Sequence, residues 1–442
     1  MTAPAAHHPE ASSPPEASAP TTSWGSPLVI SMWLLIVVAV VMGPLDISSG
    51  APKMTVGLDS TVACKLLVAG LASMLGLYAV LTSTATRQTL MTLPSVAIIT
   101  ILLLAGLATP IAISSTSLPT TLINFGYLMF TVTALLTLKL RGVGLALLAG
   151  VTVTCSIALS LWFFVPSYGV FPELLEGGLI VKRLSGTAHP NAVGRAMMLG
   201  LILTLYFYRT DVLPALPTGV LVGMFTLAAY LTLSRTAMVA GAAGVVILYL
   251  DVIFSRAGIL AMSFAVVLGI CGVTTIYMQG DEDRFIDKIL TKFSKSGNAE
   301  EITSGTGRSE IWAKAASLIG NRPIIGHGFN AAPTLMIDHS QATHNAVLQA
   351  TLAAGIIGGV LMFGLMAWNV YLVTSSNALL IRALAALIVI ASLAEDAVLE
   401  TFPGPLTIAF FVCSVYPVMV TAPNSQPGTE SRSIAGLAGD AA

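Results

Sequence analysis

Basic and titratable side chains gather at four places in this sequence, each close to the end of a long apolar run. The four segments are residues 183–191, 233–236, 305–312 and 343–345. Arginine guanidinium groups bind anionic oxygens in pairs, and a histidine can exchange a proton near neutral pH. Ionisable side chains at membrane depth are costly, so by default they mark a functional path. These segments are therefore the first candidates for chemistry.

Each of these residues also has an ordinary structural explanation. Arg183 and Arg235 could be interfacial anchors whose side chains reach lipid headgroups, and Arg308 could be a plain loop charge. His344 could cap the helix that follows it, and His189 could serve only the turn in which it lies. Position alone leaves both explanations open.

The elements that must position these residues are membrane helices. Apolar residues make up 55% of the chain and charged residues only 9%, whereas soluble domains carry about 25% charged residues. Apolar runs of about 20 residues predict spanning helices. They lie near residues 28–45, 61–81, 94–113, 120–138, 142–165, 191–208, 213–233, 236–254, 257–277, 346–373, 379–396 and 404–421. Because these runs are too long for barrel strands, the sequence predicts an all-α polytopic membrane protein with about 12 spans.

One membrane domain, residues 28–421, is expected between two tails. Residues 1–27 and 422–442 are rich in small residues and proline, a composition typical of disorder. An even number of spans places both termini on one side of the membrane. We expect them on the cytoplasmic side, although the short inner and outer loops carry nearly equal numbers of Lys and Arg.

The longest polar stretch is a loop at about residues 278–343, expected on the extracytoplasmic side. Phe285, Ile289 and Phe293 share one helical face among charged residues, and residues 308–319 carry a second apolar face. Two short amphipathic helices lying at the bilayer surface fit this pattern.

Several classes of function are disfavoured by the composition. The net charge of -1 argues against a nucleic-acid surface. The sequence lacks a G-x-x-x-x-G-K phosphate loop, so ATP hydrolysis is not expected. The cysteines stand far apart in apolar runs and predict plain core packing. They are Cys64, Cys155, Cys271 and Cys413.

The candidate motifs follow one another in a distinctive order. They are Arg183 with Gly186 and then His189-Pro190-Asn191; Ser234-Arg235-Thr236; Gly307-Arg308 with Ile311-Trp312; Pro323 with Gly326 and Gly328; and His344-Asn345 before the glycine-rich segment 355–358. This ordered set resembles the bacterial O-antigen ligase and O-antigen polymerase family, including its exopolysaccharide polymerase-like members. The resemblance covers about residues 180–370. It implies an enzyme that takes a glycan from a polyprenyl diphosphate donor and joins it to a hydroxyl of a glycan or glycolipid acceptor.

The resemblance also implies roles for individual residues. Arg183, Arg235 and Arg308 are expected to bind the diphosphate, because guanidinium groups can stabilise the charge of the leaving group. His344 is expected to act as the base that activates the acceptor hydroxyl. Neither a metal nor a cofactor is expected. Further candidates for substrate contact or for support of the site are His189, Asn191, Asn345, Glu395 and Asp396.

Two groups of acidic residues have other possible roles. The acids at 281–283 resemble the metal-binding pair of enzymes that use nucleotide sugars, but nucleotide sugars are not available outside the membrane, and a solvated helix start explains these acids. Glu395, Asp396 and Glu400 could pair with the arginines or contact sugar hydroxyls. The sequence does not choose between these two roles.

Three functions remain open from sequence. A polymerase of surface or exported polysaccharide is favoured over a ligase that joins finished glycan to a lipid acceptor. A transporter or flippase of lipid-linked sugars is the alternative of another class, because an arginine-lined cavity could bind diphosphate without catalysis. The absence of an evident inverted repeat favours the enzyme. The expected location is the bacterial cytoplasmic membrane with the active site on its extracytoplasmic face, where other polysaccharide export components could be partners.

Overall fold

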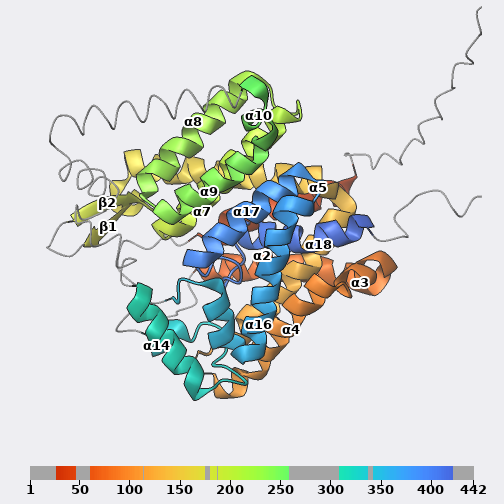
Figure 1. Ribbon diagram of the computed structural model, residues 1–442, viewed down its shortest axis with the longest axis vertical. Helices are drawn as coiled ribbons and strands as arrows, with labels where there is room; N and C mark the ends of the chain where they lie inside the picture. Colours follow the sequence, from red (N-terminus) through yellow and green to blue (C-terminus); the bar gives the residue numbers. More distant parts are fainter. Residues whose placement is uncertain are drawn as a thin grey trace, which may run out of the picture.

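The computed structural model describes residues 26–45, 60–112, 114–174, 180–186, 188–257, 308–336 and 342–421, which are mostly helical (Figure 1). The main helices are α1 (Pro27–Met42), α2 (Ser60–Thr82), α3 (Thr84–Leu90), α4 (Leu93–Leu107), α5 (Ser117–Phe164), α7 (Pro190–Arg209), α8 (Ala215–Thr232), α9 (Arg235–Leu248), α14 (Arg308–Asn321), α16 (Ala346–Ser375), α17 (Leu379–Ala394) and α18 (Pro405–Thr421). Short elements are η1 (Thr109–Ile111), α6 (Pro166–Gly169), α10 (Leu250–Ile253) and α15 (Ala332–Leu335).

The prediction of an all-α membrane fold is confirmed at this coarse level. By length and composition, 5 helices within the described ranges could cross a membrane, namely α2, α5, α7, α8 and α16, or up to 6 if the bent pair α3 and α4 is one span. Four further apolar helices, α1, α9, α17 and α18, are shorter. The expected number of about 12 spans is therefore not established. The expected run 257–277, most of the loop 278–343 with its first amphipathic helix, and most of the two tails lie outside the described residues.

The runs at 120–138 and 142–165 were expected to be separate helices, and α5 consists of two helices that meet at a kink between these runs. The break is confined to Lys139, whose φ of 59° and ψ of 172° are not helical. Lys139 and Arg141 interrupt the apolar pattern, yet they leave too few residues for a loop. The chain therefore turns at a single residue and resumes the helix.

A β-hairpin departs from the all-α expectation. Strands β1 (Val170–Leu174) and β2 (Ile180–Leu184) pair antiparallel, with Phe171 opposite Arg183. Both strands contain β-branched or aromatic residues and lie between helices, where the backbone must find its own partners. The hairpin satisfies the backbone of this connection locally.

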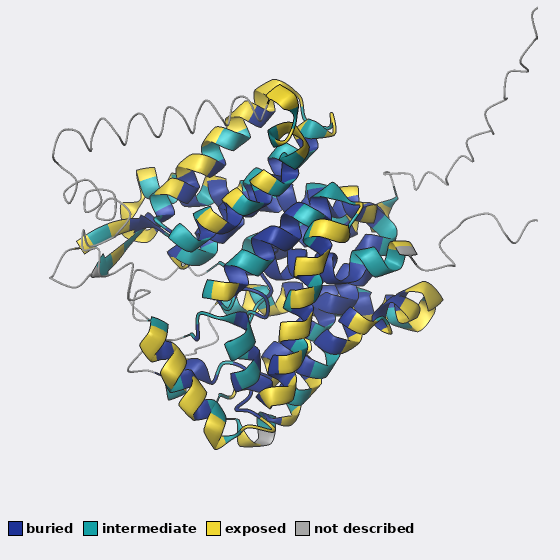
Figure 2. Ribbon diagram, viewed as in Figure 1, coloured by how far each residue is buried: buried dark blue, intermediate teal, exposed yellow. Residues whose placement is uncertain are grey.

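Close packing between helices relies on small residues, as in membrane proteins generally. A Cβ atom at Gly241 of α9 would lie 2.1 Å from the Met198 side chain of α7, and one at Gly244 would lie 2.3 Å from Ile202. Figure 2 shows the buried residues concentrated between the helices, with exposed residues along the outer faces. Many of those exposed residues are large and apolar, as expected for a surface in contact with lipid.

Five helix ends meet at one end of this helix assembly. They are the starts of α7, α9 and α16 and the ends of α8 and α17, joined by the side-chain contacts described below. This end also receives the hairpin and α14. The described residues of all four motif-bearing segments are therefore brought together here.

Candidate active site

Glu395, the residue directly after α17, lies at the centre of a buried polar cluster. Its Oε1 accepts a hydrogen bond from Asn191 Nδ2 at 2.9 Å and lies 3.4 Å from Arg308 Nη2. Its Oε2 lies 3.3 Å from Arg195 Nη1 and 3.3 Å from His344 Nδ1. The residue is only 3% exposed. One carboxylate thus joins four helix ends that are far apart in sequence.

The electrostatics of the cluster keep Glu395 ionised. Burial alone would raise the pKa of this carboxyl, but the hydrogen bond with His344 and the charges of Arg195 and Arg308 lower it to about 2. Burial raises the pKa of the neighbouring Asp396 and Glu400 carboxyls. Glu395 is therefore the permanent anion of the group.

His344 is held between the loop before α16 and the end of α17. Its backbone is left-handed, with φ of 51°, a conformation that is uncommon for a residue with a side chain. A proton on Nδ1 can be donated to Glu395, which makes Nε2 the nitrogen able to accept another proton. The arrangement is suited to general-base chemistry.

Asn345 supports this geometry as a helix cap. Its Oδ1 accepts hydrogen bonds from the backbone N–H groups of Val347 and Leu348, both at 3.0 Å, and its Nδ2 donates to Leu393 O at 3.1 Å. The first contacts begin α16, and the last fastens that start to the end of α17. All these contacts are structural, so Asn345 holds its neighbour His344 in place.

Arg183 is buried beneath the site, with 1% of its surface exposed. Nε donates to Thr232 O at 2.8 Å, Nη1 pairs with Glu173 Oε2 at 2.8 Å, and Nη2 donates to Asn191 Oδ1 at 2.7 Å. The guanidinium therefore ties the hairpin to the end of α8 and the start of α7. This environment differs from the open one expected of a diphosphate ligand, because protein groups occupy each of its nitrogens.

Arg308 and Arg235 are the first residues of α14 and α9. Arg308 Nη2 lies 3.5 Å from the hydroxyl of Thr236, the residue after Arg235, and the Arg308 side chain is 25% exposed. Arg235 is half-buried. Both arginines thus lie at helix starts in the same part of the site, and part of the Arg308 side chain is accessible from outside the protein.

His189 forms the turn before α7. Its Nδ1 accepts a hydrogen bond from the backbone N–H of Asn191 at 3.3 Å, and its ring meets Phe171 edge-on with centroids 5.6 Å apart. Burial and the charge of Arg183 lower the pKa of His189 to about 4, in agreement with an unprotonated Nδ1. These contacts favour the structural explanation for this histidine.

Arg195 was not singled out from the sequence. It lies in α7 with 6% of its surface exposed and pairs with Glu395 and with Glu400, whose Oε1 is 3.1 Å from its Nη2. An arginine inside an apolar run is itself a signal of function in a membrane protein. Weighing charges inside the predicted helices, as well as at their ends, would have found it.

The Pro-x-x-Gly-x-Gly motif forms a strap, residues 323–328, across a break in α16. At Gly355 the helix has φ of 72° and ψ of -173°. The N–H groups of His327 and Gly328 donate to Leu352 O and Ala353 O at 2.8 and 3.0 Å. These bonds satisfy carbonyl groups that the break would otherwise leave without partners.

The predicted second helix of the loop is present as α14, which ends at Asn321, and its position at the bilayer surface stays a prediction. Ile311, Ala315 and Leu318 form its buried face, as the sequence indicated. Trp312 Nε1 donates to Thr343 O at 3.1 Å, directly before His344. Arg308 and Trp312 of this motif thus both attach the start of α14 to the site.

A family model described as O-antigen ligase matches residues 219–363. This segment carries the O-antigen ligase family domain. The predicted resemblance is confirmed, and the family indicates a ligase- or polymerase-like, glycosyltransferase-like function in polysaccharide biosynthesis with lipid-linked glycan substrates. The apolar helices and the family together fit a multi-pass membrane protein. No curated protein matches the chain.

The O-antigen ligase domain contains only part of the cluster. Arg235, Arg308 and His344 lie within the matched residues, whereas Arg195 and Glu395 lie on either side of them. The central carboxylate therefore comes from the segment that follows the domain.

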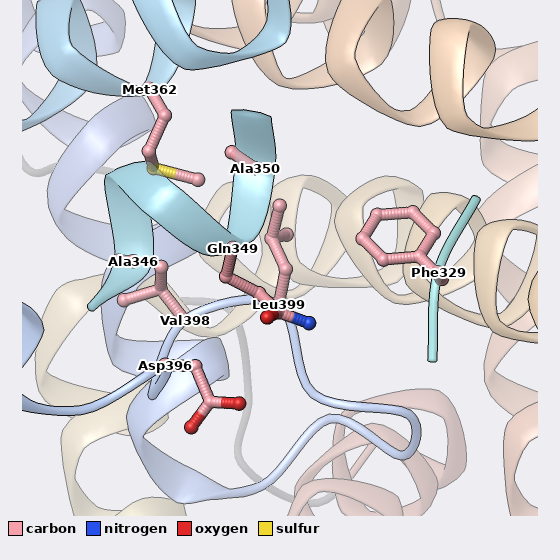
Figure 3. A pocket seen from close by; sticks show the side chains of 8 residues that line it. All are labelled: Phe329, Ala346, Gln349, Ala350, Met362, Asp396, Val398 and Leu399. Carbon is pink, nitrogen blue, oxygen red and sulfur yellow. The ribbon is translucent and has the colours of Figure 1, made fainter. Parts of the chain in front are cut away.

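A small cavity lies beside the cluster (Figure 3). Its volume of about 10 Å³ corresponds to about one water molecule, too little for a sugar. Figure 3 shows the Asp396 carboxylate turned away from the apolar side chains that form most of the wall. The lining residues are Phe329, Ala346, Gln349, Ala350, Met362, Asp396, Val398 and Leu399. The cavity therefore lies among the residues that pack behind the cluster and is not a substrate pocket.

Proposed function

We propose that this protein is a metal-independent membrane glycosyltransferase that polymerises glycan from a polyprenyl-diphosphate-linked donor in surface or exported polysaccharide biosynthesis. The observation that carries the proposal is the contact of His344 with the anionic Glu395 beside Arg308, inside an O-antigen ligase family chain. The active site faces the extracytoplasmic side of the cytoplasmic membrane, where donor and acceptor glycans meet.

In the proposed reaction, His344 is the base. Nε2 takes the proton of an acceptor hydroxyl as the oxygen attacks the anomeric carbon of the donor sugar. The bond between that carbon and the diphosphate oxygen breaks, and polyprenyl diphosphate leaves with the electron pair. Glu395 stabilises the resulting imidazolium through Nδ1, and the proton later passes to solvent.

Arg308 and Arg235 are the proposed ligands of the diphosphate. The exposed part of Arg308 allows its guanidinium to reach phosphate oxygens, and its long 3.4 Å contact with Glu395 is weaker than an ideal ion pair. Arg183 takes a supporting part in this scheme, because its bonds to Asn191 and Thr232 align the helix ends that form the site.

The contact between His344 and Glu395 is the feature that favours an enzyme over a transporter. A flippase needs cations to hold the diphosphate, but it does not need a base oriented by a carboxylate. A ligase would use the same groups on a different acceptor, so the acceptor has to be identified by experiment.

The test is the intermediate that accumulates in cells carrying His344→Ala or His344→Gln. Glutamine can still donate to Glu395 but cannot accept the proton, so both variants should lose activity while the protein is inserted normally. Single repeat units on the lipid carrier support the polymerase. Long carrier-bound chains indicate the ligase instead, and normal polysaccharide removes His344 from catalysis. Arg209→Gln, at the far end of α7, is the matched control for expression and folding.

A further inference from the structure

Arg195 is the most deeply buried of the groups that meet Glu395. Its side chain is 7% exposed, compared with 25% for Arg308 and 25% for His344. It lies within α7, where a charge in apolar surroundings is retained only with compensating partners. Those partners are the two carboxylates of Glu395 and Glu400.

The contacts of Arg195 connect the Glu395 carboxylate with the core of the helix assembly. Arg195 and His344 share the same oxygen, Oε2, of Glu395. Glu400 takes the other nitrogen of Arg195, Nη2, and the Glu400 backbone carbonyl accepts a hydrogen bond from Asn124 of α5 at 2.9 Å. The chain of contacts therefore runs from the core of the helix assembly to the imidazole.

We propose that Arg195 is a positioning residue, anchored by Glu400, that holds Glu395 and thereby orients His344 and Arg308. The inference rests on the proposed function, because it assigns a purpose to Arg195 only if His344 acts as the base. Arg195 does not touch the glycan or the diphosphate.

The charges around His344 determine what loss of Arg195 does to its proton affinity. Glu395 and Asp396 are the facing acids, and Arg195 and Arg308 are the facing cations. Glu400 pairs with Arg195, while Arg183 and His189 lie on the far side of Asn191. When the positive charge of Arg195 is removed, less of the negative charge of Glu395 is neutralised. The carboxylate then attracts the proton of His344 more strongly.

The experiment compares Arg195→Gln, Arg195→Lys and Arg209→Gln in the full chain, purified and reconstituted in vesicles. The donor is the lipid-linked glycan that accumulates in cells lacking this protein. Arg209 is a matched control, because it also pairs with an acid, Asp251, and with a backbone carbonyl. Arg195→Gln should lower kcat about 100-fold with little change in the donor KM, as expected when a catalytic group is misplaced.

The pH profile distinguishes positioning from simple support of the fold. In Arg195→Gln the acidic limb of kcat/KM should move up by about 1 pH unit, whereas Arg195→Lys should keep the limb near that of the wild type and recover part of kcat. An unchanged kcat and an unchanged limb in well-folded Arg195→Gln overturns the inference. If Arg195→Gln does not fold, Glu400→Gln decides through kcat, because it removes only the 27% exposed partner, and an unchanged kcat overturns the inference. The acidic limb of Glu400→Gln should not move up, since this variant removes an anion and not a cation.

A parallel measurement on His344→Ala distinguishes failure of the proposed function from failure of the role of Arg195. Full activity of His344→Ala overturns the proposed function itself. Inactive His344→Ala combined with a normal Arg195→Gln profile overturns only the role of Arg195.

Discussion

Two arginines expected to share a role occupy different environments at the scale of the residue. Arg183 is 1% exposed and has its three nitrogens bound by protein, whereas the Arg308 side chain is 25% exposed and its contacts with Glu395 and Thr236 are long, at 3.4 and 3.5 Å. A guanidinium that binds phosphate oxygens must first give up its protein partners. It therefore needs weak contacts with the protein and an exposed surface that the phosphate can reach. Arg308 meets both conditions and Arg183 meets neither.

Replacement of Arg308 or Arg235 by Lys should lower activity nearly as much as replacement by Ala, by about 100-fold. A single ammonium group cannot reproduce the paired N–H donors of a guanidinium on diphosphate oxygens. Turnover of the lipid-linked donor by reconstituted protein measures the effect, with Arg209→Lys as the control. Near wild-type turnover in both Lys variants would remove these arginines from the site.

Replacement of Arg183 by Lys should act on stability instead. Lysine cannot serve Thr232, Glu173 and Asn191 together, and the buried acceptors left without donors should cost about 2 kcal/mol. Thermal unfolding in detergent should therefore show a lower Tm for Arg183→Lys than for Arg308→Lys. Equal Tm values for the two variants would contradict this assignment.

The Glu395 cluster should make stability depend on pH in the acid range. Because the pKa of Glu395 falls from 4.5 to about 2 in the folded protein, the contribution of the carboxylate is complete above about pH 4.5 and is lost as the pH falls toward 2. The Tm difference between wild type and Glu395→Gln should be constant from about pH 8 to about pH 5 and shrink below that. A difference that grows on acidification would reverse the assignment.

Turnover should survive an excess of chelator, because guanidinium groups take the part that a metal would play on the leaving group. The measurement is turnover before and after treatment with EDTA. Loss of turnover that a divalent cation restores would implicate acids such as Glu395, Asp396 and Glu400.

At the scale of the element, the break at Gly355 separates the first turns of α16, which follow His344, from the rest of that helix. Gly355 is left-handed, with φ of 72°, and a Cβ atom there would lie 2.1 Å from Ile324 O of the strap. Only glycine fits both the conformation and the close approach. The strap and the break therefore form one unit with the start of α16.

Gly355→Ala should disturb this unit and lower activity at least 10-fold, since small displacements of a catalytic group are costly. Gly364→Ala is the matched control in the same helix, because nothing lies within 4 Å of its Cβ position. Activity normalised to folded protein measures both variants. Equal activity of the two would show that the break does not govern the position of His344.

At the scale of the whole molecule, the helix ends around Glu395 form one side of the protein and the connection between α16 and α17 belongs to the other. Ser317 of α14 and Asn377 of that connection are both exposed. They mark the two sides for a topology experiment.

Cysteine introduced at Ser317 should react with a membrane-impermeant reagent in intact cells, whereas cysteine at Asn377 should react only after the cells are opened. This result follows if the active site faces away from the cytoplasm. The background carries Cys64→Ser, which removes an exposed native thiol, and Cys271→Ala, which removes a thiol outside the described residues. Labelling of the Asn377 site alone in intact cells would invert the topology.

The sequence by itself determined the class of the molecule. Every expected apolar run inside the described ranges lies on a helix, because the match between run length and bilayer thickness is a local property. The apolar face of α14 was equally readable, since it depends on residues three or four positions apart. The ordered motifs also located the polar segments that converge on one end of the helices.

Only the tertiary structure decided how those segments combine. Asn191 and Glu395 are 204 positions apart, and Arg195 and Glu400 are 205 apart, so no local pattern could pair them. The burial of Arg183 depends on a hairpin and on the end of another helix, which hydropathy does not describe. Charge pairing and access are properties of packed surfaces, and for that reason the central position of Glu395 and its ion pair with Arg195 became visible only in the fold.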